Sequence, residues 1–398
     1  MRSPRFIFVV CLSVTMCLFA QTPALAAPPR WVQRVDSLVS GLPVSITIAL
    51  KGDTLYRYKD WVARPPASNE KLLLSMALLR RFGTDATIPT RLFATEQVGA
   101  DGVLEGNLWI IGHGDPEIDA LDMAELARAL VDAGVERIRG HVFGGTGPFA
   151  RDWWAPGWRD YFPDVYIALP TALTYRSNEG VGGRHLVDPE RLAAKALTKK
   201  LEARTVEVTG KPGSGSAPRG LVALASITSD PLSSIMRRMN LISSNFRAEV
   251  LGKMLGAERL GPPGTIAKGA RVIEGFADSH GVRLVAHDSS GLSYDNRVST
   301  EGITEMLRLA ERAPWGEVLR GTLPAGGEGT LQDRLEKVTI RAKTGTLIDV
   351  STLSGWVWLE REDEWAAFSI LSSGIDEDRA KTIENKIVRV VAANAAQR

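Results

Sequence analysis

Residues 43–58 read PVSITIALKGDTLYRY. Two runs rich in β-branched and aromatic residues flank Lys51-Gly52-Asp53, and glycine and aspartate favour tight turns, so this stretch predicts a β-hairpin. Helical periodicity begins at Ser68 and ends at Gly83, a residue typical of helix C-termini.

The C-terminal part of the chain predicts three more strands. Residues 337–345 run into a strand that ends at Lys343, and residues 352–360 and 365–371 form the other two. A final helix is expected from about Ile375. Strands from both ends of the chain predict one five-stranded sheet in an α/β (α+β) fold, which makes the middle of the chain an insertion.

The domain limits follow from this arrangement. We expect a main domain from residues 27–86 and 222–398 and a smaller inserted domain from residues 87–221. Within the insertion, residues 146–168 are rich in Trp, Pro and Gly.

The first 26 residues have the features of a signal peptide. Arg2 and Arg5 precede an apolar run that is short for a membrane span, and Ala24-Leu25-Ala26 fits a cleavage site. An uncleaved N-terminal anchor is the alternative. Cleavage predicts export across the inner membrane to the periplasm, with no stable membrane anchor afterwards.

Charge, cysteine and histidine content narrow the possible partners. Both cysteines lie in residues 1–26, and after loss of Arg2 and Arg5 the chain carries 46 basic and 46 acidic residues. A net charge of zero argues against a nucleic-acid partner or a polybasic membrane patch. The five histidines show no metal-ligand spacing, so no metal or other cofactor is predicted.

Ser68 and Lys71 stand three residues apart at the predicted start of a helix. Three residues is nearly one helical turn, so both side chains lie on one face. A lysine with a depressed pKa can take the proton of a serine nucleophile, and free N–H groups at a helix N-terminus favour a developing oxyanion. The alternative is a helix cap at Ser68 with Lys71 in solvent.

Ser243-Ser244-Asn245 precedes a helical run over residues 246–255. The hydroxyl of Ser243 is suited to relay a proton to a leaving amine, and the amide of Asn245 to orient a substrate amide while bonding Lys71. A helix cap is again the alternative.

Lys343-Thr344-Gly345-Thr346 lies on a predicted strand. The positive charge of Lys343 is expected to depress the pKa of Lys71. The hydroxyls of Thr344 and Thr346 suit a substrate carboxylate, and Gly345 leaves room for a ligand at the edge strand. The alternative is an ordinary strand end.

Each motif occurs once, in the order SxxK, SxN, KTG, the set found in penicillin-binding proteins and class A β-lactamases. The segments 102–116 (GVLEGNLWIIGHGDP), 288–298 (DSSGLSYDNRV) and 341–355 (RAKTGTLIDVSTLSG) extend the likeness. The chain resembles the low-molecular-mass class C penicillin-binding proteins, the D-alanyl-D-alanine carboxypeptidase/endopeptidase family, over essentially all of its length after residue 26.

The resemblance implies a β-lactamase/transpeptidase-like fold, with an antiparallel five-stranded sheet between helices. It implies cleavage of peptidoglycan stem peptides through an acyl-enzyme on Ser68, with Lys71 as base, and acylation of the same serine by β-lactam antibiotics such as penicillin. The other implied roles are proton relay and substrate orientation by Ser243 and Asn245, carboxylate binding by Lys343, Thr344 and Thr346, and an oxyanion hole from the backbone N–H groups of Ser68 and Thr346.

Some alternatives stay open. Because only 175 residues separate Ser68 from Ser243, the insertion is expected to be shorter than usual for the family. A β-lactamase or esterase on the same fold, or a non-catalytic peptidoglycan-binding protein, would share the motifs, although the ExxLN segment of class A β-lactamases is absent. The balance of carboxypeptidase and endopeptidase activity is also open, because both cut after D-alanine.

Overall fold

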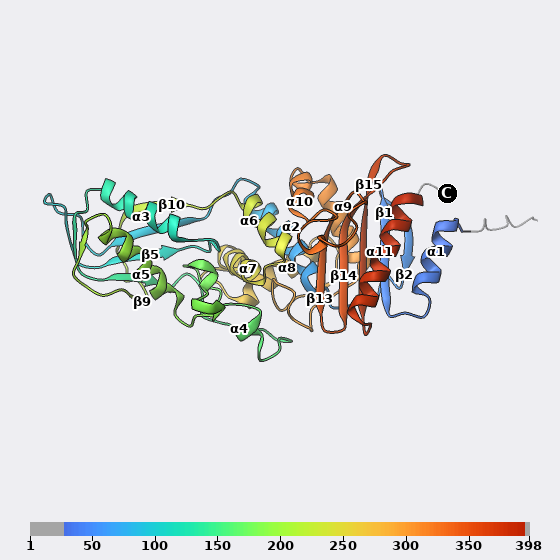
Figure 1. Cartoon of the computed structure of the whole chain (residues 1–398), viewed down its shortest axis with the longest axis horizontal. Coiled ribbons are helices and arrows are strands. Elements are labelled where there is room, and N and C mark those ends of the chain that lie inside the picture. Colours follow the sequence, from blue (N-terminus) through green and yellow to red (C-terminus); the bar gives the residue numbers. More distant parts are fainter. Residues whose placement is uncertain (1–27, 395–398) are drawn as a thin grey trace, which may run out of the picture.

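The computed structural model describes residues 28–394, which form two lobes along one long axis (Figure 1). One lobe contains both ends of the described chain, and the far lobe contains residues from its middle. The predicted signal peptide, residues 1–26, lies outside the described residues. Within the described part, no helix is both long and apolar enough to span a membrane.

The first lobe is built on an antiparallel sheet with the strand order β13-β14-β15-β1-β2. The strands are β1 (Val44–Leu50), β2 (Asp53–Tyr58), β13 (Ile340–Leu347), β14 (Val350–Leu359) and β15 (Glu364–Ser373). The predicted five-stranded sheet from both chain ends is therefore confirmed. The predicted strand end at Lys343 is wrong: β13 continues to Leu347, because residues 344–347 stay paired with β14.

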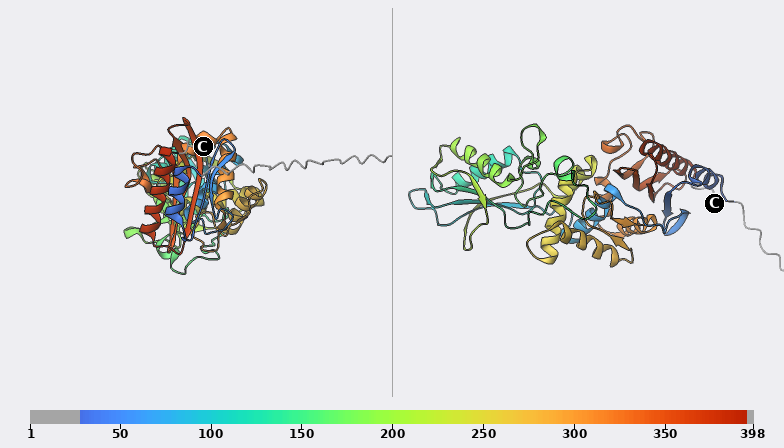
Figure 2. Two further views of the ribbon diagram at one scale, coloured as in Figure 1. Left: turned by 90° about the vertical axis from the view of Figure 1, so that its right-hand side faces the viewer. Right: turned by 90° about the horizontal axis from the view of Figure 1, so that it is seen from below.

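Helices cover both faces of this sheet, as the end-on view in Figure 2 shows. On one face, α1 (Arg30–Val39) and α11 (Glu377–Asn394) enclose a core that includes Ile46, Phe368 and Val391. On the other face, a second core includes Leu73, Met239 and Trp356. The helices of that face are α2 (Glu70–Phe82), α6 (Leu232–Ile242), α7 (Asn245–Leu260), α8 (Ile266–Asp278), α9 (Thr300–Arg312) and α10 (Gly316–Thr322).

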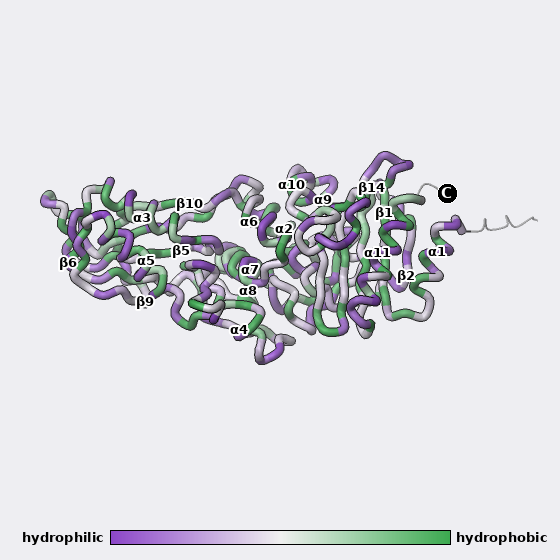
Figure 3. Tube along the Cα trace, in the orientation of Figure 1, coloured by the Kyte–Doolittle hydropathy of each residue, from purple (hydrophilic) through white to green (hydrophobic). Residues whose placement is uncertain are grey.

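Hydropathy along the chain agrees with this layering. Glu360-Arg361-Glu362-Asp363, the turn between β14 and β15, projects as a hydrophilic tip (Figure 3). Most of β14 itself is buried, because helices cover both faces of the strand. The buried sheet can therefore hold functional side chains that pack against it in fixed positions.

The far lobe contains two further sheets with α3 (Ala120–Asp132) and α5 (Pro189–Glu202) packed on them. One sheet has the order β10-β3-β5-β7-β9 and the other β4-β6-β8. Their strands are β3 (Pro89–Ala94), β4 (Val103–Glu105), β5 (Leu108–Gly112), β6 (Arg137–Arg139), β7 (Val142–Gly145), β8 (Glu207–Val208), β9 (Gly213–Gly215) and β10 (Val222–Thr228). The domain limits stay a prediction, and the pairing of β10 with β3 favours an upper limit for the insertion near residue 228.

Residues 147–170, here called the return segment, leave the far lobe and pack on α7 and α8. Lys253 on α7 is buried and its Nζ donates to the carbonyl oxygens of Ala150, Asp152 and Pro170 at 2.9–3.0 Å. All three N–H groups of the Lys253 ammonium therefore donate to the return segment and hold it against α7. This helix begins at Asn245.

Candidate active site

The turn that carries Ser68 is fastened to the sheet. Ser68 lies in a 3-10 turn (Ala67–Asn69) directly before α2, where Ala67 has a φ of 46°. The Asn69 side chain donates to Ser354 Oγ at 2.7 Å, and Thr352 Oγ1 donates to the Pro66 carbonyl at 2.9 Å. A left-handed residue beside the predicted nucleophile is the kind of backbone strain that persists only when its surroundings hold it.

Lys71 lies against Ser68, as the motif spacing predicts. Its Nζ is 3.0 Å from Ser68 Oγ, 2.9 Å from Asn245 Oδ1 and 2.5 Å from the carbonyl oxygen of Ser290. Lys71 is fully buried, so the alternative of a solvent-exposed lysine is wrong. Ser68 is also not the helix cap of α2, because Asn69 occupies that position and Ser68 lies in the turn before it.

Burial is the main reason why Lys71 can act as a base. It lowers the pKa of Lys71 to about 8, against the opposing effect of the carboxyl groups of Asp288, Glu249 and Glu70. Burial also raises the pKa of Glu249 to about 8 and that of Glu70 well above its ordinary value. Glu249 and Glu70 therefore carry less negative charge near Lys71 than ordinary carboxylates would.

Lys343 also lies in this network. Its Nζ donates to Ser243 Oγ at 2.8 Å and to the Thr344 carbonyl at 2.7 Å. Burial, and then the charge of Lys71, hold the pKa of Lys343 well below its ordinary value. Burial is the first cause of the lowered pKa at both lysines, so the expected effect of Lys343 on the pKa of Lys71 stays a prediction and is secondary to burial.

The SxN motif divides its roles between capping and the cleft. Ser244 caps α7, because its hydroxyl accepts from the N–H of Arg247 at 3.3 Å. Ser243 has a left-handed backbone, with a φ of 56°, and ends α6. Its hydroxyl and the Asn245 amide are thereby left for Lys343 and Lys71. Of the three residues of this motif, only Ser244 is the N-terminal cap of a helix.

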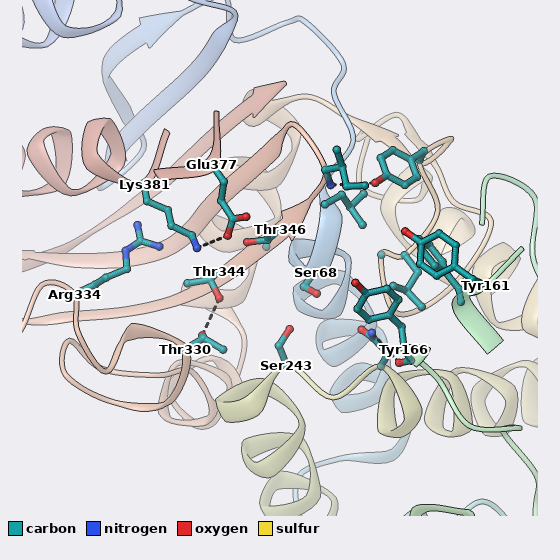
Figure 4. Close-up of a pocket in the computed structure, with 18 residues that line it drawn as sticks. Ser68, Tyr161, Tyr166, Ser243, Thr330, Arg334, Thr344, Thr346, Glu377 and Lys381 are labelled. Carbon is teal, nitrogen blue, oxygen red and sulfur yellow. Dashed lines mark hydrogen bonds and ion pairs between the residues drawn. The ribbon is translucent and has the colours of Figure 1, made fainter. Parts of the chain in front are cut away.

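The KTG residues line the cleft from the edge strand β13. Thr344 Oγ1 donates to Thr330 Oγ1 at 2.8 Å, and Thr346 is exposed. Figure 4 shows Ser68, Ser243, Thr344 and Thr346 around one space. The structure brings together every residue that the motifs predict, from three separate parts of the fold: the serine turn with α2, the junction of α6 and α7, and β13.

Gly345 permits the close approach of β13 to the serine turn. A Cβ there would lie 2.3 Å from Thr352 Oγ1 and 2.8 Å from the backbone N of Ser68. Gly345→Ala is expected to destabilise the protein by about 1–3 kcal/mol through overpacking. It should also slow acylation of Ser68 by roughly 10²-fold, since a shift of about 1 Å at a reacting group has that cost.

Two measurements check this prediction: the free energy of unfolding in denaturant and the rate of acylation by a β-lactam. Gly321→Ala on α10 is the matched control, because a Cβ there meets nothing within 4 Å. Equal behaviour of the two variants would contradict the close-approach argument.

The cleft is a cavity of about 570 Å³ with chemically different ends. At one end lie aromatic and apolar side chains, and at the other lie hydroxyl and charged groups. The first set contains Tyr161, Phe162, Tyr166, Leu292 and Tyr294, and the second contains Thr330, Arg334, Glu377 and Lys381. The three motifs predict none of these residues. Tyr161, Phe162 and Tyr166 come from the Trp-, Pro- and Gly-rich residues 146–168, and Leu292 and Tyr294 from the segment 288–298, but neither stretch indicated a place in the cleft.

Asp288 links the aromatic end to Lys71. Its carboxylate accepts from Trp158 Nε1 at 2.6 Å and from the backbone N–H groups of Gly291 and Ser293 at 2.9 and 2.7 Å. The loop that it holds supplies the Ser290 carbonyl to Lys71. The Asn245 amide in turn donates to the Tyr166 carbonyl at 3.2 Å. The return segment is therefore fixed relative to Lys71 and Asn245.

No group of three or more His, Cys, Asp or Glu side chains within residues 28–394 is arranged to hold a metal ion. The polar groups around Ser68 are instead two lysines, hydroxyls and an amide, a donor set suited to serine chemistry.

Comparison with known proteins agrees with this geometry. The model of the D-Ala-D-Ala carboxypeptidase 3 (S13) family matches residues 33–182 and 178–394. A D-alanyl-D-alanine carboxypeptidase of an Actinomadura species is 28% identical over 432 residues, covering 85% of this chain and 78% of the relative. A carboxypeptidase of Mycobacterium tuberculosis is 30% identical over 395 residues, covering 89% and 81%.

Solved structures show the same fold. Penicillin binding protein 4 from Haemophilus influenzae superposes with a TM-score of 0.79 at 19% identity, over 90% of this chain and 99% of that one. A predatory peptidoglycan endopeptidase from Bdellovibrio bacteriovorus superposes with a TM-score of 0.56 at 17% identity, over 88% and 91%.

Proposed function

Since the chain belongs to the D-Ala-D-Ala carboxypeptidase 3 (S13) family, a family of serine peptidases and low-molecular-mass class C penicillin-binding proteins, we propose that Ser68 cleaves D-Ala-D-Ala ends of peptidoglycan stem peptides. The single observation that carries the assignment of residues is the 3.0 Å contact of Lys71 with Ser68 inside a buried network. A buried lysine with a lowered pKa beside a serine is the arrangement that activates this nucleophile.

The first step forms the acyl-enzyme. Neutral Lys71 takes the Ser68 proton while Oγ bonds to the carbonyl carbon of the penultimate D-alanine. The backbone N–H groups of Ser68 and Thr346 stabilise the resulting oxyanion. The close packing of β13 on the Ser68 turn supports this pairing, because a Cβ on Gly345 would lie 2.8 Å from the Ser68 nitrogen.

The second step releases the terminal residue. As the peptide C–N bond breaks, the proton that Lys71 took from Ser68 passes to the leaving amine through the Ser243 hydroxyl, which is held by Lys343 at 2.8 Å, and Lys71 is neutral again. Thr344 and Thr346 hold the terminal carboxylate, and Asn245 orients the peptide amide. Water then hydrolyses the ester, with Lys71 again as base, and Ser68 regains its proton.

A peptidoglycan substrate also implies where the protein acts and which antibiotics inhibit it. We infer that the protein acts outside the cytoplasmic membrane, in the periplasm, after loss of residues 1–26. We also infer that β-lactams acylate Ser68. A structure of the Haemophilus influenzae penicillin binding protein 4, which shares the fold, is complexed with a β-lactam.

The function is tested by incubating the protein without residues 1–26 with a stem peptide that ends in D-Ala-D-Ala and measuring released D-alanine by mass spectrometry. The proposal predicts release of one D-alanine per peptide and a product shortened by that residue. Retained binding to peptidoglycan without any release would instead support a non-catalytic binding protein.

A further inference from the structure

To act as a base, Lys71 must direct a lone pair at Ser68, and its other contacts control that direction. A neutral amine has two N–H groups and one lone pair. Apart from Ser68 Oγ at 3.0 Å, the amine nitrogen contacts Asn245 Oδ1 at 2.9 Å and the Ser290 carbonyl oxygen at 2.5 Å. These two oxygens can only accept hydrogen bonds. When they take the two N–H groups, the lone pair is left for the Ser68 hydroxyl.

Both of these acceptors depend on α7. Asn245 is the first residue of this helix, and its side chain reaches Lys71 directly. One turn further along α7, Glu249 Oε1 accepts from the backbone N–H groups of Ser289 and Ser290 at 2.8 and 2.7 Å. The carbonyl group of Ser290 is the second acceptor. Glu249 therefore joins the loop that holds Lys71 to the helix that carries Asn245.

This loop packs closely on the serine turn. A Cβ on Gly291 would lie 1.8 Å from the Ala67 carbonyl oxygen and 3.0 Å from the Ser68 nitrogen. Asp288 accepts from N–H groups within its own loop, so it shapes the loop from inside. Glu249, which is fully buried, instead connects the loop to a neighbouring helix. A small displacement of the loop would therefore move the acceptor that Lys71 needs.

We propose that Glu249 is a positioning residue for the acylation of Ser68: through the backbone of Ser289 and Ser290 it fixes the carbonyl group that orients the amine of Lys71. This inference rests on the proposed function. Ser68, Lys71 and Glu249 then act as nucleophile, base and orienting group, the general arrangement of an activated serine. Here the orienting group acts on the base through a backbone carbonyl.

Two variants separate the hydrogen bonds of Glu249 from its charge. Glu249→Gln keeps an oxygen that can accept the two backbone N–H groups, whereas Glu249→Met is of similar size and has no oxygen to accept them. Both variants lose the carboxyl group, whose charge raises the pKa of Lys71. The difference between the two variants therefore reports on the hydrogen bonds. The measurement is single-turnover acylation of Ser68 by benzylpenicillin, analysed for the rate constant at saturation and the preceding dissociation constant.

Glu249→Met is expected to lower the saturating rate constant roughly 10²-fold, the cost of a shift of about 1 Å at a reacting group, with the dissociation constant within about twofold. Glu249→Gln should stay within about threefold of the wild type at about pH 9, where Lys71, with a pKa of about 8, is already mostly neutral. A role in stability alone would leave the folded molecules of both variants with the wild-type rate constant.

Glu274→Met is the matched control. Glu274 on α8 makes the same kind of contact, because its Oε1 accepts from the backbone N–H group of Ala286 at 2.8 Å, four residues before Ser290. Its loss should leave the rate constant within about twofold, since the contact lies before the loop that meets Lys71. If Glu249→Met does not fold, Glu249→Asp replaces it, since this variant withdraws the carboxyl group by one methylene and should acylate about tenfold more slowly.

The outcomes distinguish this role from the proposed function. A wild-type rate constant in folded Glu249→Met, or in Glu249→Asp where that variant replaces it, would overturn the positioning role while the proposed function stands. An equal loss in Glu249→Gln and Glu249→Met would also overturn it, because the retained oxygen would then have no effect. A wild-type protein in which benzylpenicillin does not acylate Ser68 would defeat both.

Discussion

Ser68→Ala is expected to lower D-alanine release by roughly 10⁵- to 10⁶-fold, the scale of loss when a serine peptidase loses its nucleophile. The methyl side chain cannot form the acyl-enzyme, while Lys71 keeps its acceptors on Asn245 and Ser290. The fold should therefore survive the change. The check is steady-state release of D-alanine at enzyme concentrations high enough to detect the residual rate.

Ser37→Ala is the matched control for this prediction. Ser37 is exposed on α1, and its hydroxyl bonds only to the carbonyl of Gln33 in the same helix, at 2.8 Å. Thermal unfolding of both variants should remain within a few degrees of the wild type, since each loses at most about 1 kcal/mol. Activity above one-hundredth of wild type in a folded Ser68→Ala protein would exclude Ser68 as the nucleophile.

Lys71→Ala is expected to lower the rate of Ser68 acylation by about 10²- to 10⁴-fold, the usual contribution of a general base. An exposed lysine outside the cleft, Lys337, provides the control Lys337→Ala. Because Ser68 and Lys71 act as one unit, the double variant should be no slower than the slower single variant. Losses that simply multiply would show that the two residues act independently.

The pH dependence of acylation tests the same role in the wild type. The folded-state pKa of Lys71 is lowered to about 8, so the neutral form that accepts a proton gains population as pH rises through that value. The rate should rise about tenfold per pH unit below pH 8 and level off above it. A rate that stays flat between about pH 6 and pH 9 would contradict lysine as the base.

The catalytic motifs could be predicted from the sequence because their geometry is local. Ser68 and Lys71 are three residues apart, so a helix places their side chains on one face. A glycine within a strand, such as Gly345, indicates that another group packs closely against the backbone there, even when the sequence does not show which group it is. The hairpin over residues 43–58 likewise depends on a turn sequence within itself. In each case the signal lies within a few residues of the structure that it predicts.

The rest of the site depends on contacts between distant segments. Lys253 carries no sequence signal for its role, because its three carbonyl partners lie 83 to 103 residues earlier in the chain. The same holds for Trp158 and Asp288, and for Arg334, whose partners come from α11. The extent of β13 beyond Lys343 was missed because pairing with β14 overrides the local pattern.

The most direct test of the central claim is the intact mass of the protein after incubation with benzylpenicillin, followed by peptide mapping of any adduct. The account predicts a single adduct with the mass of the drug, located on Ser68. Its absence while the drug stays intact, or an adduct on any other residue, would contradict the assignment of Ser68 as the nucleophile of a penicillin-binding peptidase. Rapid destruction of the drug without a stable adduct would indicate a β-lactamase instead.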